Sequence, residues 1–278
     1  MISVIIPTYN RELTILRSIE SVLNQSVTDL ELIIVDDCSS DNTKKIIDDI
    51  KDNRLRYIRH EINSGACTAR NTGLDAANGD FIAFQDSDDE WHFDKLEKQL
   101  AVFEKNDVDI VFCKMQKNVD GQTDVFPKRF SEGILENRND LMGISTQTII
   151  AKRSVFNKHR FDTRMPRLQD LELMMRLSRD YIIYCLDEPL VDYYVSDDAI
   201  STSNIKFFEA CKIIFEKYPE IHYQYPELCR DFCRLLIQQS ATQEKQLKKD
   251  MLTLSMDYSH DYKNVVRYIL AKFNIYRT

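Results

Sequence analysis

Two sequence patterns that mark nucleotide-binding proteins are missing from this chain of 278 residues. It contains neither Gly-x-Gly-x-x-Gly nor Gly-Lys followed by Ser or Thr, and it has only 6 glycines in all. Such glycine-rich loops hold the phosphates of dinucleotides and nucleoside triphosphates on backbone amides. The sequence therefore supports neither a Rossmann dinucleotide site nor a P-loop, and the charge of a phosphate ligand would have to be met by a metal ion instead.

Long apolar runs are also missing. No segment approaches the roughly 18 consecutive apolar residues that a membrane-spanning helix needs, and the chain opens without the basic and apolar regions of a signal peptide. The 7 cysteines are odd in number and have no short-spaced framework, which is typical of a reduced cytoplasm. A formal net charge of −8 argues against a nucleic-acid partner. We expect a cytoplasmic protein.

The most informative stretch that is present runs from Gly79 to Asp89. A short apolar segment, residues 81–84, reads as a buried strand and is followed by carboxylates at Asp86, Asp88 and Asp89. Acidic groups packed this closely repel one another unless a cation lies between them. Hard oxygen ligands suit magnesium or manganese (Mg²⁺ or Mn²⁺), held by one or two carboxylates and the phosphates of a substrate. The alternative is a solvated acidic turn after a strand.

Strand and helix patterns alternate through the first part of the chain. Buried strands are predicted at 3–6, 30–35, 55–58 and 81–84, and helices at about 12–25, 42–50 and 66–77. Polar loops follow the carboxyl end of each strand. This alternation predicts an α/β fold with a doubly wound, mostly parallel sheet and helices on both faces, whose ligands lie beyond the carboxyl ends of the strands.

Farther along, strands are predicted at 108–113, 181–186 and 190–195. After the first of these strands comes a looser β region with a turn at Asp120 and Gly121, and a helix is predicted after Gln169. From about 204 helical periodicity takes over. We therefore predict a domain over 1–203 and a helical region over 204–278 that shapes the acceptor side, touches a membrane or makes an oligomer contact. The last stretch is basic and without acids from Lys263 onward, so its helix either lies on an anionic membrane or packs on the main domain.

Several segments, in this order and spacing, resemble the inverting family 2 glycosyltransferases of the GT-A fold, of the type that builds bacterial surface polysaccharides. They span most of 1–203 and are residues 4–10, 35–41, 65–73, 79–91 and 169–170. The resemblance implies a nucleotide-sugar site. Its nucleotide-sugar-binding positions match Pro7, Tyr9, Asp37, Arg70, Asp86 and Asp89, its metal ligand matches Asp88, and a residue beneath the acceptor matches Trp91.

The roles implied for these residues have structural alternatives. Tyr9 would stack on the base, and Asp37 would accept from a base N–H, which favours uracil; Asp37 could instead cap a helix. Arg70 would reach the nucleotide, or else form a surface ion pair. Trp91 would contact the acceptor, or else anchor the helix after it.

Asp170 matches the catalytic base of the family. Inversion needs one carboxylate to take the proton of the acceptor hydroxyl as its oxygen attacks opposite the leaving phosphate. The family usually has Glu-Asp here, and this chain has Gln169-Asp170. The loss of a neighbouring like charge should lower the pKa of Asp170, other things equal. The alternative is a helix N-cap.

One position departs from the family pattern. Many members carry a histidine that joins the metal or the diphosphate, and the matching position here is Ser196. A hydroxyl is a poor metal ligand in its place, so the metal would be held by Asp88, phosphates and water, or with help from Asp197 or Asp198.

The resulting hypothesis is a UDP-sugar-dependent hexosyl- or N-acetylhexosaminyltransferase that needs Mn²⁺ or Mg²⁺ and acts on a glycan or a lipid-linked saccharide, with peripheral membrane contact through the C-terminal helices. A nucleotidyltransferase is one alternative, although its glycine-rich phosphate loop is replaced by Pro7-Thr8-Tyr9. A non-catalytic module that binds sugar nucleotides or glycans is another. Metal-dependent release of UDP distinguishes the catalytic alternatives from the binding one.

Overall fold

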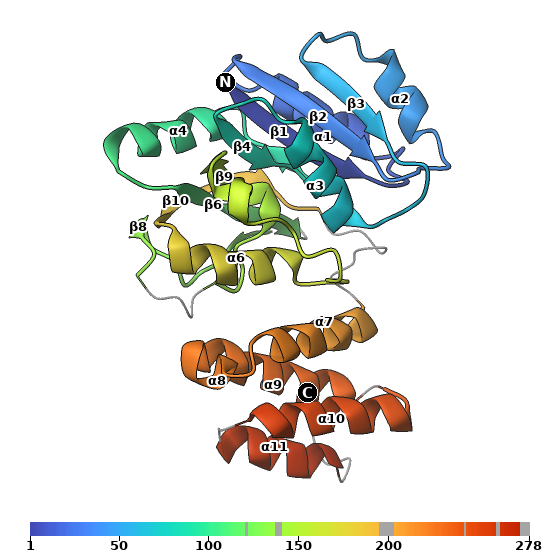
Figure 1. The fold of residues 1–278 in the computed structure, drawn as a ribbon, viewed down its shortest axis with the longest axis vertical. Coiled ribbons are helices and arrows are strands. Elements are labelled where there is room, and N and C mark those ends of the chain that lie inside the picture. Colours follow the sequence, from blue (N-terminus) through green and yellow to red (C-terminus); the bar gives the residue numbers. More distant parts are fainter. Residues whose placement is uncertain (120–121, 137–140, 195–202, 242, 260–261, 273–278) are drawn as a thin grey trace. The chain divides into compact units, whose positions relative to one another are not determined.

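The computed structural model describes residues 1–119, 122–136, 141–194, 203–241, 243–259 and 262–272. They form two compact units (Figure 1). The N-terminal unit comprises 1–136, 143–163 and 169–197, and the C-terminal unit comprises 137–142, 164–168 and 198–278. The functions assigned above to 1–203 and 204–278 stay predictions.

The first half of the sheet is parallel, as expected. Its strands are β1 (Ile2–Thr8), β2 (Leu30–Asp36), β3 (Leu55–Arg59) and β4 (Phe81–Phe84), in the order β3-β2-β1-β4. The chain adds strands on both sides of β1, which is a reversal of strand order. The carboxyl ends of β1, β2 and β4 therefore meet at one edge of the sheet, where a doubly wound fold binds its ligands.

The second half of the sheet is mixed. The order continues through β9 (Ile149–Lys152), β6 (Ile110–Val119), β10 (Ile183–Asp192) and β5 (Glu90–Trp91), with β7 (Gln122–Phe126) on β6 and β8 (Gly133–Ile134) on β10. β9 runs antiparallel to both neighbours, while β6 and β10 are parallel. The predicted turn at Asp120 and Gly121 lies outside the described residues.

Two strand predictions are corrected. The two predicted runs meet in one strand, β10, which takes in residues 183–186 of the first and 190–192 of the second and crosses Pro189 with shifts of register on either side. A proline cannot donate to the ladder, so it mimics a strand end in the sequence. Likewise β1 does not end before Pro7, which pairs with Val35. The locked φ of proline is compatible with extended backbone near the end of a strand.

The two faces of β1 pack on different helices, because successive side chains of a strand point to opposite sides. Val4 and Ile6 share a core with the helices α1 (Ile15–Leu23), α2 (Thr43–Asp49) and α4 (Lys95–Lys105). Ile5 faces α3 (Ala66–Ala76), where a Cβ on Gly73 would come within 2.4 Å of the Ile5 Cγ2. The missing side chain of Gly73 therefore lets α3 lie close to β1 (Figure 1).

Three further elements complete this unit: a 3-10 turn, η1 (Thr146–Thr148), and the helices α5 (Val155–Lys158) and α6 (Gln169–Asp180). Phe84, on the same face as its neighbour Ile5, meets Phe156 of α5 edge-on with 5.4 Å between the ring centroids.

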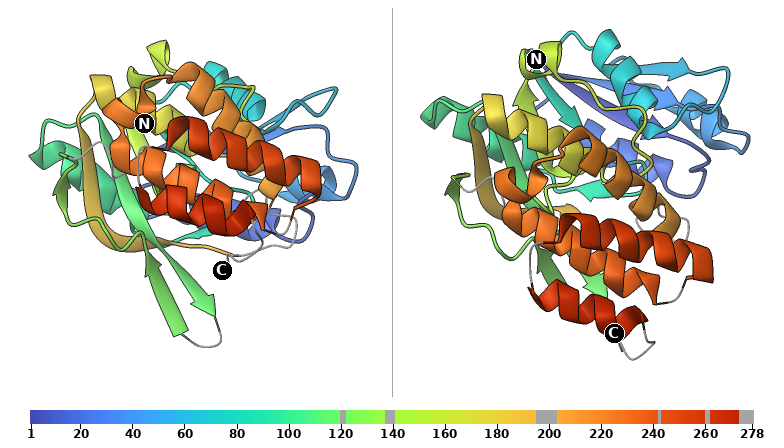
Figure 2. Two further views of the ribbon diagram at one scale, coloured as in Figure 1. Left: turned by 90° about the horizontal axis from the view of Figure 1, so that it is seen from below. Right: turned by 60° about the horizontal axis from the view of Figure 1, so that its bottom comes forward.

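The C-terminal unit is helical, as predicted. Its helices are α7 (Asn204–Lys217), α8 (Ile221–Gln224), α9 (Pro226–Ser240), α10 (Lys245–Tyr258) and α11 (Tyr262–Lys272). Within this unit α9, α10 and α11 lie side by side (Figure 2) and share a small core of Ile237, Leu252 and Ala271. Among the described residues, no helix is both long enough and apolar enough to span a bilayer.

Candidate functional site

The backbone of the acidic motif is fixed by the start of α1. Thr14 and Ser18 donate side-chain hydroxyl hydrogen bonds of 2.9 Å to the carbonyls of Ser87 and Asp86, and the Arg17 guanidinium donates to the carbonyl of Asp88. Because these donors bind main-chain oxygens, they hold the turn after β4 in place while its carboxylates stay available for other partners.

Two carboxylates of the motif are partly exposed and meet arginines. Asp86 pairs with Arg70 at 2.8 Å, and Asp88 faces the Arg11 Nε at 3.7 Å. Burial raises the pKa of Asp88, and the neighbouring charge of Asp86 raises it further. An added cation near Asp88 would offset this cost of burial and of like charge, and a metal ion at this position stays a prediction.

The third carboxylate, Asp89, is buried, with 1% of its surface exposed. Its two oxygens accept from the Gln147 side-chain amide at 2.8 Å and from the Tyr194 backbone N–H at 3.0 Å. Burial raises the pKa of Asp89 to about 8, with the charge of Asp86 as the next cause. Both donors are neutral, so the buried charge of Asp89 is only partly compensated.

Trp91 is buried beneath this motif. Its indole N–H donates to the carbonyl of Gln147 at 3.0 Å, and the Lys95 ammonium lies 3.9 Å from the ring centroid. Lys95 is itself fully buried, donates to Gln99, and has its pKa lowered to about 8 by burial. These contacts are those of an anchor for α4, while a contact between Trp91 and an acceptor stays a prediction.

Arg70 joins the acidic motif to the segment that begins α6. Its two terminal nitrogens donate to Asp86 and to the side-chain oxygen of Gln169, each at 2.8 Å, and the residue is 6% exposed. Its Nε has no hydrogen-bond partner among the described residues. The buried guanidinium therefore connects the acidic motif to Gln169, which lies 99 residues from Arg70 in the sequence.

Asp170 lies in the first turn of α6, and the helix already begins at Gln169, so Asp170 is not its N-cap. One of its oxygens accepts from the Leu171 N–H at 2.8 Å. Burial raises the pKa of Asp170, while the charge of Arg70 lowers it and that of Asp86 raises it again. The replacement of an acid by Gln169 was expected to favour a lower pKa, but loss of water is the larger effect.

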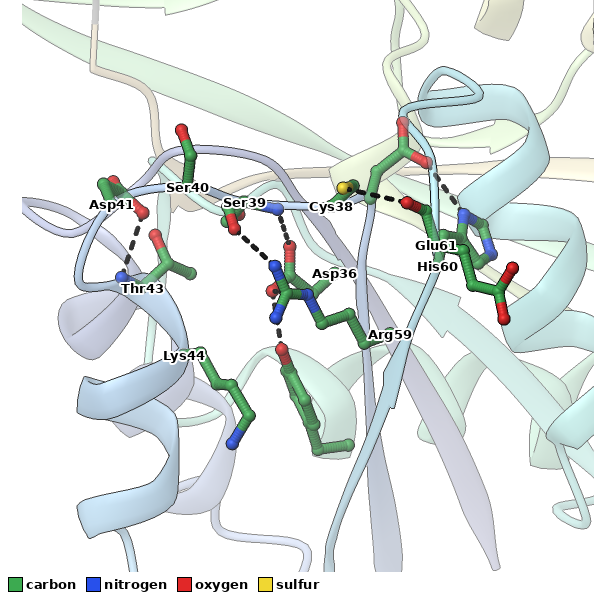
Figure 3. A network of polar contacts seen from close by, with 12 residues as sticks. Asp36, Cys38, Ser39, Ser40, Asp41, Thr43, Lys44, Arg59, His60 and Glu61 are labelled. Atoms are coloured by element: carbon green, nitrogen blue, oxygen red, sulfur yellow. Dashed lines mark hydrogen bonds and ion pairs between the residues drawn. The ribbon is translucent and has the colours of Figure 1, made fainter.

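The loop after β2 has a polar network of its own (Figure 3). Asp36 is fully buried and accepts from the Ser39 N–H at 2.8 Å and from the Tyr57 hydroxyl at 2.6 Å. Cys38 has φ of 70°, in the left-handed region that a side chain disfavours, and its thiol donates to the carbonyl of Glu61.

Asp37 is held by the segment that leads into α3. Its carboxylate accepts from the backbone N–H groups of Ser64 and Gly65, the latter at 2.6 Å, and lies 2.8 Å from the His60 Nδ1. Asp37 is therefore not the N-cap of α2 or α3, whose N-cap residues are Asn42 and Gly65; it fixes the turn that precedes α3. Its role toward a base stays a prediction.

The two base-flanking positions predicted near the end of the first strand differ in exposure. Tyr9 is 43% exposed, so its ring can meet a ligand, whereas Pro7 is buried within β1. The loop 195–202 lies outside the described residues, and with it Ser196, Asp197 and Asp198. Within the part of the chain that the structure describes, no three His, Cys, Asp or Glu side chains gather as a metal site.

The supports of this site were not predicted: the start of α1 under the acidic motif, Gln147, Tyr194 in its contact with Asp89, and Lys95. Gln147 and Tyr194 lie 58 and 105 residues from Asp89. No local pattern signals such contacts, because they depend on the order of the strands. The apolar spacing of Leu96, Leu100 and Phe103, which is that of a helix, also gives no indication that Lys95 is buried.

The chain belongs to glycosyl transferase family 2. The model of the family described as "Glycosyl transferase family 2" matches residues 3–164. The resemblance noted in the sequence is thereby confirmed, and so is the fold class, an α/β GT-A sheet with a C-terminal helical region.

Two bacterial relatives match over most of the chain. UDP-Glc:alpha-D-GlcNAc-diphosphoundecaprenol beta-1,3-glucosyltransferase WfgD of Escherichia coli is 33% identical, over 74% of this chain and 81% of its own. Putative teichuronic acid biosynthesis glycosyltransferase TuaG of Bacillus subtilis (strain 168) is 30% identical, over 82% of this chain and 92% of its own.

A solved structure shares the fold. The crystal structure of S. aureus TarS 1-349 in complex with UDP-GlcNAc superposes with a TM-score of 0.75 at 22% identity, over 99% of this chain and 88% of that one. Against a longer TarS chain the TM-score is 0.71, and this chain covers 53% of it.

Proposed function

We propose that this protein is an inverting, metal-dependent glycosyltransferase that moves a hexose or N-acetylhexosamine from a UDP-sugar to a saccharide or lipid-linked saccharide in polysaccharide biosynthesis. Family membership supports the reaction class. The relatives' names support the pathway and the donor, since WfgD is named for UDP-Glc and a diphosphoundecaprenol-linked sugar and TuaG for teichuronic acid.

One observation carries the proposal: the Arg70 guanidinium bonds to both Asp86 and Gln169. It sets the start of α6, and with it Asp170, against the acidic motif at the end of β4. A donor bound at Asp86 would then have a carboxylate near its reacting carbon, which is the arrangement that inversion requires.

In the proposed complex the donor spans the carboxyl edge of the sheet. Tyr9 stacks on uracil beside Pro7, Asp37 accepts from the base, and Arg70 and Asp86 bind the nucleotide portion. Asp89 lies near the donor sugar. Because both Asp37 oxygens already accept from the backbone N–H groups of Ser64 and Gly65, the base shares an oxygen with them or displaces one.

The donor set around Asp88 fits a divalent cation that the substrate helps to hold. Asp86 and Asp88 supply hard oxygens and are partly exposed, and Mg²⁺ or Mn²⁺ bound by one or two carboxylates completes its shell with phosphates and water. When bound, the ion would neutralise the leaving diphosphate. Arg11 faces Asp88 in its absence, so this arginine would move or share the carboxylate.

Asp170 is proposed as the base. It takes the proton of the acceptor hydroxyl while that oxygen forms its bond to the anomeric carbon and the bond from that carbon to the diphosphate oxygen breaks. The electron pair of the broken bond leaves with UDP. Burial raises the pKa of Asp170 and with it the basicity of the carboxylate, while the charge of Arg70 lowers this pKa and favours the ionised form.

We further propose that the enzyme works in the cytoplasm with peripheral contact at the inner face of the membrane. The lipid-linked acceptor in the name of WfgD supports this location. The C-terminal helical region, 204–278, would supply the membrane contact or shape the acceptor side; an oligomer contact is the alternative.

The test is Asp170→Asn. We expect UDP binding by calorimetry to stay unchanged while transfer falls by about 10²- to 10⁴-fold, the usual contribution of a general base. Asp180→Asn is the matched control, because Asp180 is an exposed acid at the other end of α6. An Asp170→Asn enzyme with wild-type transfer would contradict the assignment of the base.

Family membership favours a glycosyltransferase over a nucleotidyltransferase. The non-catalytic alternative predicts UDP binding without any metal-dependent UDP release, and it would be established by that result with a full panel of UDP-sugars and acceptors.

A further inference from the structure

Two helices of the C-terminal unit direct basic side chains into one pocket. α9 contributes Arg230 and Arg234, and α11 contributes Lys263 and Arg267; together with Asp231 they line a pocket of about 170 Å³. Each basic pair has the spacing i, i+4 and therefore occupies one face of its helix. Four cations and one carboxylate give the lining a net charge of +3, in a protein whose net charge is −8.

Hydrogen bonds and an ion pair hold the two helices and the side chains that line the pocket. Asn264 is fully buried; its amide donates to the Arg230 carbonyl at 3.2 Å, and its oxygen accepts from Arg267 at 2.8 Å. Arg234 pairs with Asp231 at 3.1 Å. Asn264 thus ties α11 to α9 and orients one arginine, and Asp231 is the one acidic residue in the lining of the pocket.

Exposed apolar residues adjoin the pocket on α11. Val266 and Ile269 are 51% and 48% exposed, and at spacing i, i+3 they share one face of the helix. Val266 follows Lys263 by three residues, so the apolar face borders the basic one. The helix contains no acidic residue. An exposed aliphatic face edged by cations is typical of helices that lie in a membrane interface.

We propose that this pocket binds the phosphate of an anionic lipid headgroup at a membrane surface, while Val266 and Ile269 enter the headgroup layer. At about 30 Å³ per liquid water, the pocket has room for several waters and thus for a phosphate group. The planar guanidinium group of arginine can donate two parallel hydrogen bonds to the oxygens of one phosphate. The adjoining aliphatic face favours a bilayer over a soluble polyanion.

The inference deepens the proposed membrane contact and rests on the proposed function only in taking a membrane as the partner. It assigns the membrane contact to the four basic residues of the pocket instead of to the basic residues of the C-terminal unit as a whole. Charge in general would act through any exposed lysine of the unit, whereas the pocket would act through its own four residues.

Co-sedimentation with lipid vesicles tests it. We expect the full-length protein to bind vesicles with 30% phosphatidylglycerol, a composition chosen as roughly that of an anionic membrane, and not vesicles of phosphatidylcholine alone. Arg234→Gln with Lys263→Gln should weaken binding by roughly thirtyfold, about fivefold per cation. Lys245→Gln with Lys249→Gln, two exposed residues at i, i+4 on α10, is the control of equal charge change and should lose much less.

Three results would overturn the inference: no binding to anionic vesicles, equal losses in the two double variants, or displacement from vesicles by millimolar pyrophosphate. The last would mean that the pocket takes a soluble phosphate. Val266→Ser with Ile269→Ser should weaken vesicle binding, and an unchanged affinity would also contradict it. Circular dichroism confirms that each variant is folded.

Failure of this inference is separate from failure of the proposed function. UDP release by the wild-type protein without vesicles tests the glycosyltransferase site alone. Vesicle binding without UDP release, or UDP release without vesicle binding, identifies which of the two is wrong.

Discussion

Gln147 offers the sharpest test of how the acidic motif is held. Its side-chain amide donates to a buried Asp89 oxygen at 2.8 Å, while its backbone carbonyl accepts from Trp91 and is retained in any variant. Gln147→Leu keeps the approximate size of the side chain and removes its amide, and with it the N–H donor to Asp89. A hydrogen bond to a charged group contributes about 1.5–3 kcal/mol, so we expect the free energy of unfolding to fall by that amount when Asp89 is ionised.

The loss should depend on pH. Burial raises the pKa of Asp89 to about 8 from an ordinary value near 4. The Gln147 hydrogen bond stabilises the charged form, so its removal raises this pKa further. The variant should therefore be destabilised most at pH 9, where Asp89 is ionised in the wild type, and less at pH 6, where the folded state holds the proton.

Gln85→Leu is the matched control. Gln85 is a buried amide that also binds Asp89, but at its backbone carbonyl, 2.9 Å away. A neutral hydrogen bond is involved, so any loss should be about 1 kcal/mol and the same at both pH values. Urea unfolding without divalent cations measures both variants. A Gln147→Leu loss that is equal at pH 6 and pH 9 would refute the reasoning.

Three further predictions follow from the same contacts. Burial raises the pKa of Asp170 while the charge of Arg70 lowers it, so the rate of transfer should fall at acid pH with a midpoint above the ordinary pKa of about 3.9. Arg70→Gln should move the midpoint of kcat/KM to higher pH. An unchanged midpoint would contradict an effect of Arg70 on the pKa of the base. Lys95 has its pKa lowered to about 8, so its buried charge costs stability below pH 8 and this cost is lost as pH rises toward 10.5. Urea unfolding should therefore show the wild type gaining stability relative to Lys95→Met between pH 8 and 10, and a constant difference would contradict this. Tyr9→Ala should weaken UDP binding by about tenfold, within the range for base stacking, while Tyr223→Ala, at 77% exposure in the other unit, should leave it unchanged in the same titration.

The sequence was sufficient for the parallel half of the sheet. β-branched runs such as residues 3–6 end in polar loops, and the helices between them have clear apolar faces, so local patterns agree with the final fold. The antiparallel strands β7, β8 and β9 were foreseen only as a looser β region. Their pairing depends on partners distant in the chain, which periodicity does not reveal.

The sequence predicted the charged residues of the site but not the residues that hydrogen-bond to them. Carboxylates after a buried strand are conspicuous in a sequence, and so is an arginine on a helix that follows a glycine turn. What Asp89 contacts is decided by Gln147 and Tyr194, which reach it from η1 and from the chain after β10. The capping alternative for Asp37 could be stated from the sequence, but its partners Ser64 and Gly65 emerged only from the fold.

The central claim is that the carboxylates after β4 hold a donor against Asp170. We would measure UDP release from a panel of UDP-sugars, with Mn²⁺ and with a chelator, by the wild type and by Asp88→Ala. The account predicts slow release from one donor that requires both the metal and Asp88. Release that is indifferent to the metal and to Asp88, or a wild-type protein that does not bind UDP, would contradict it.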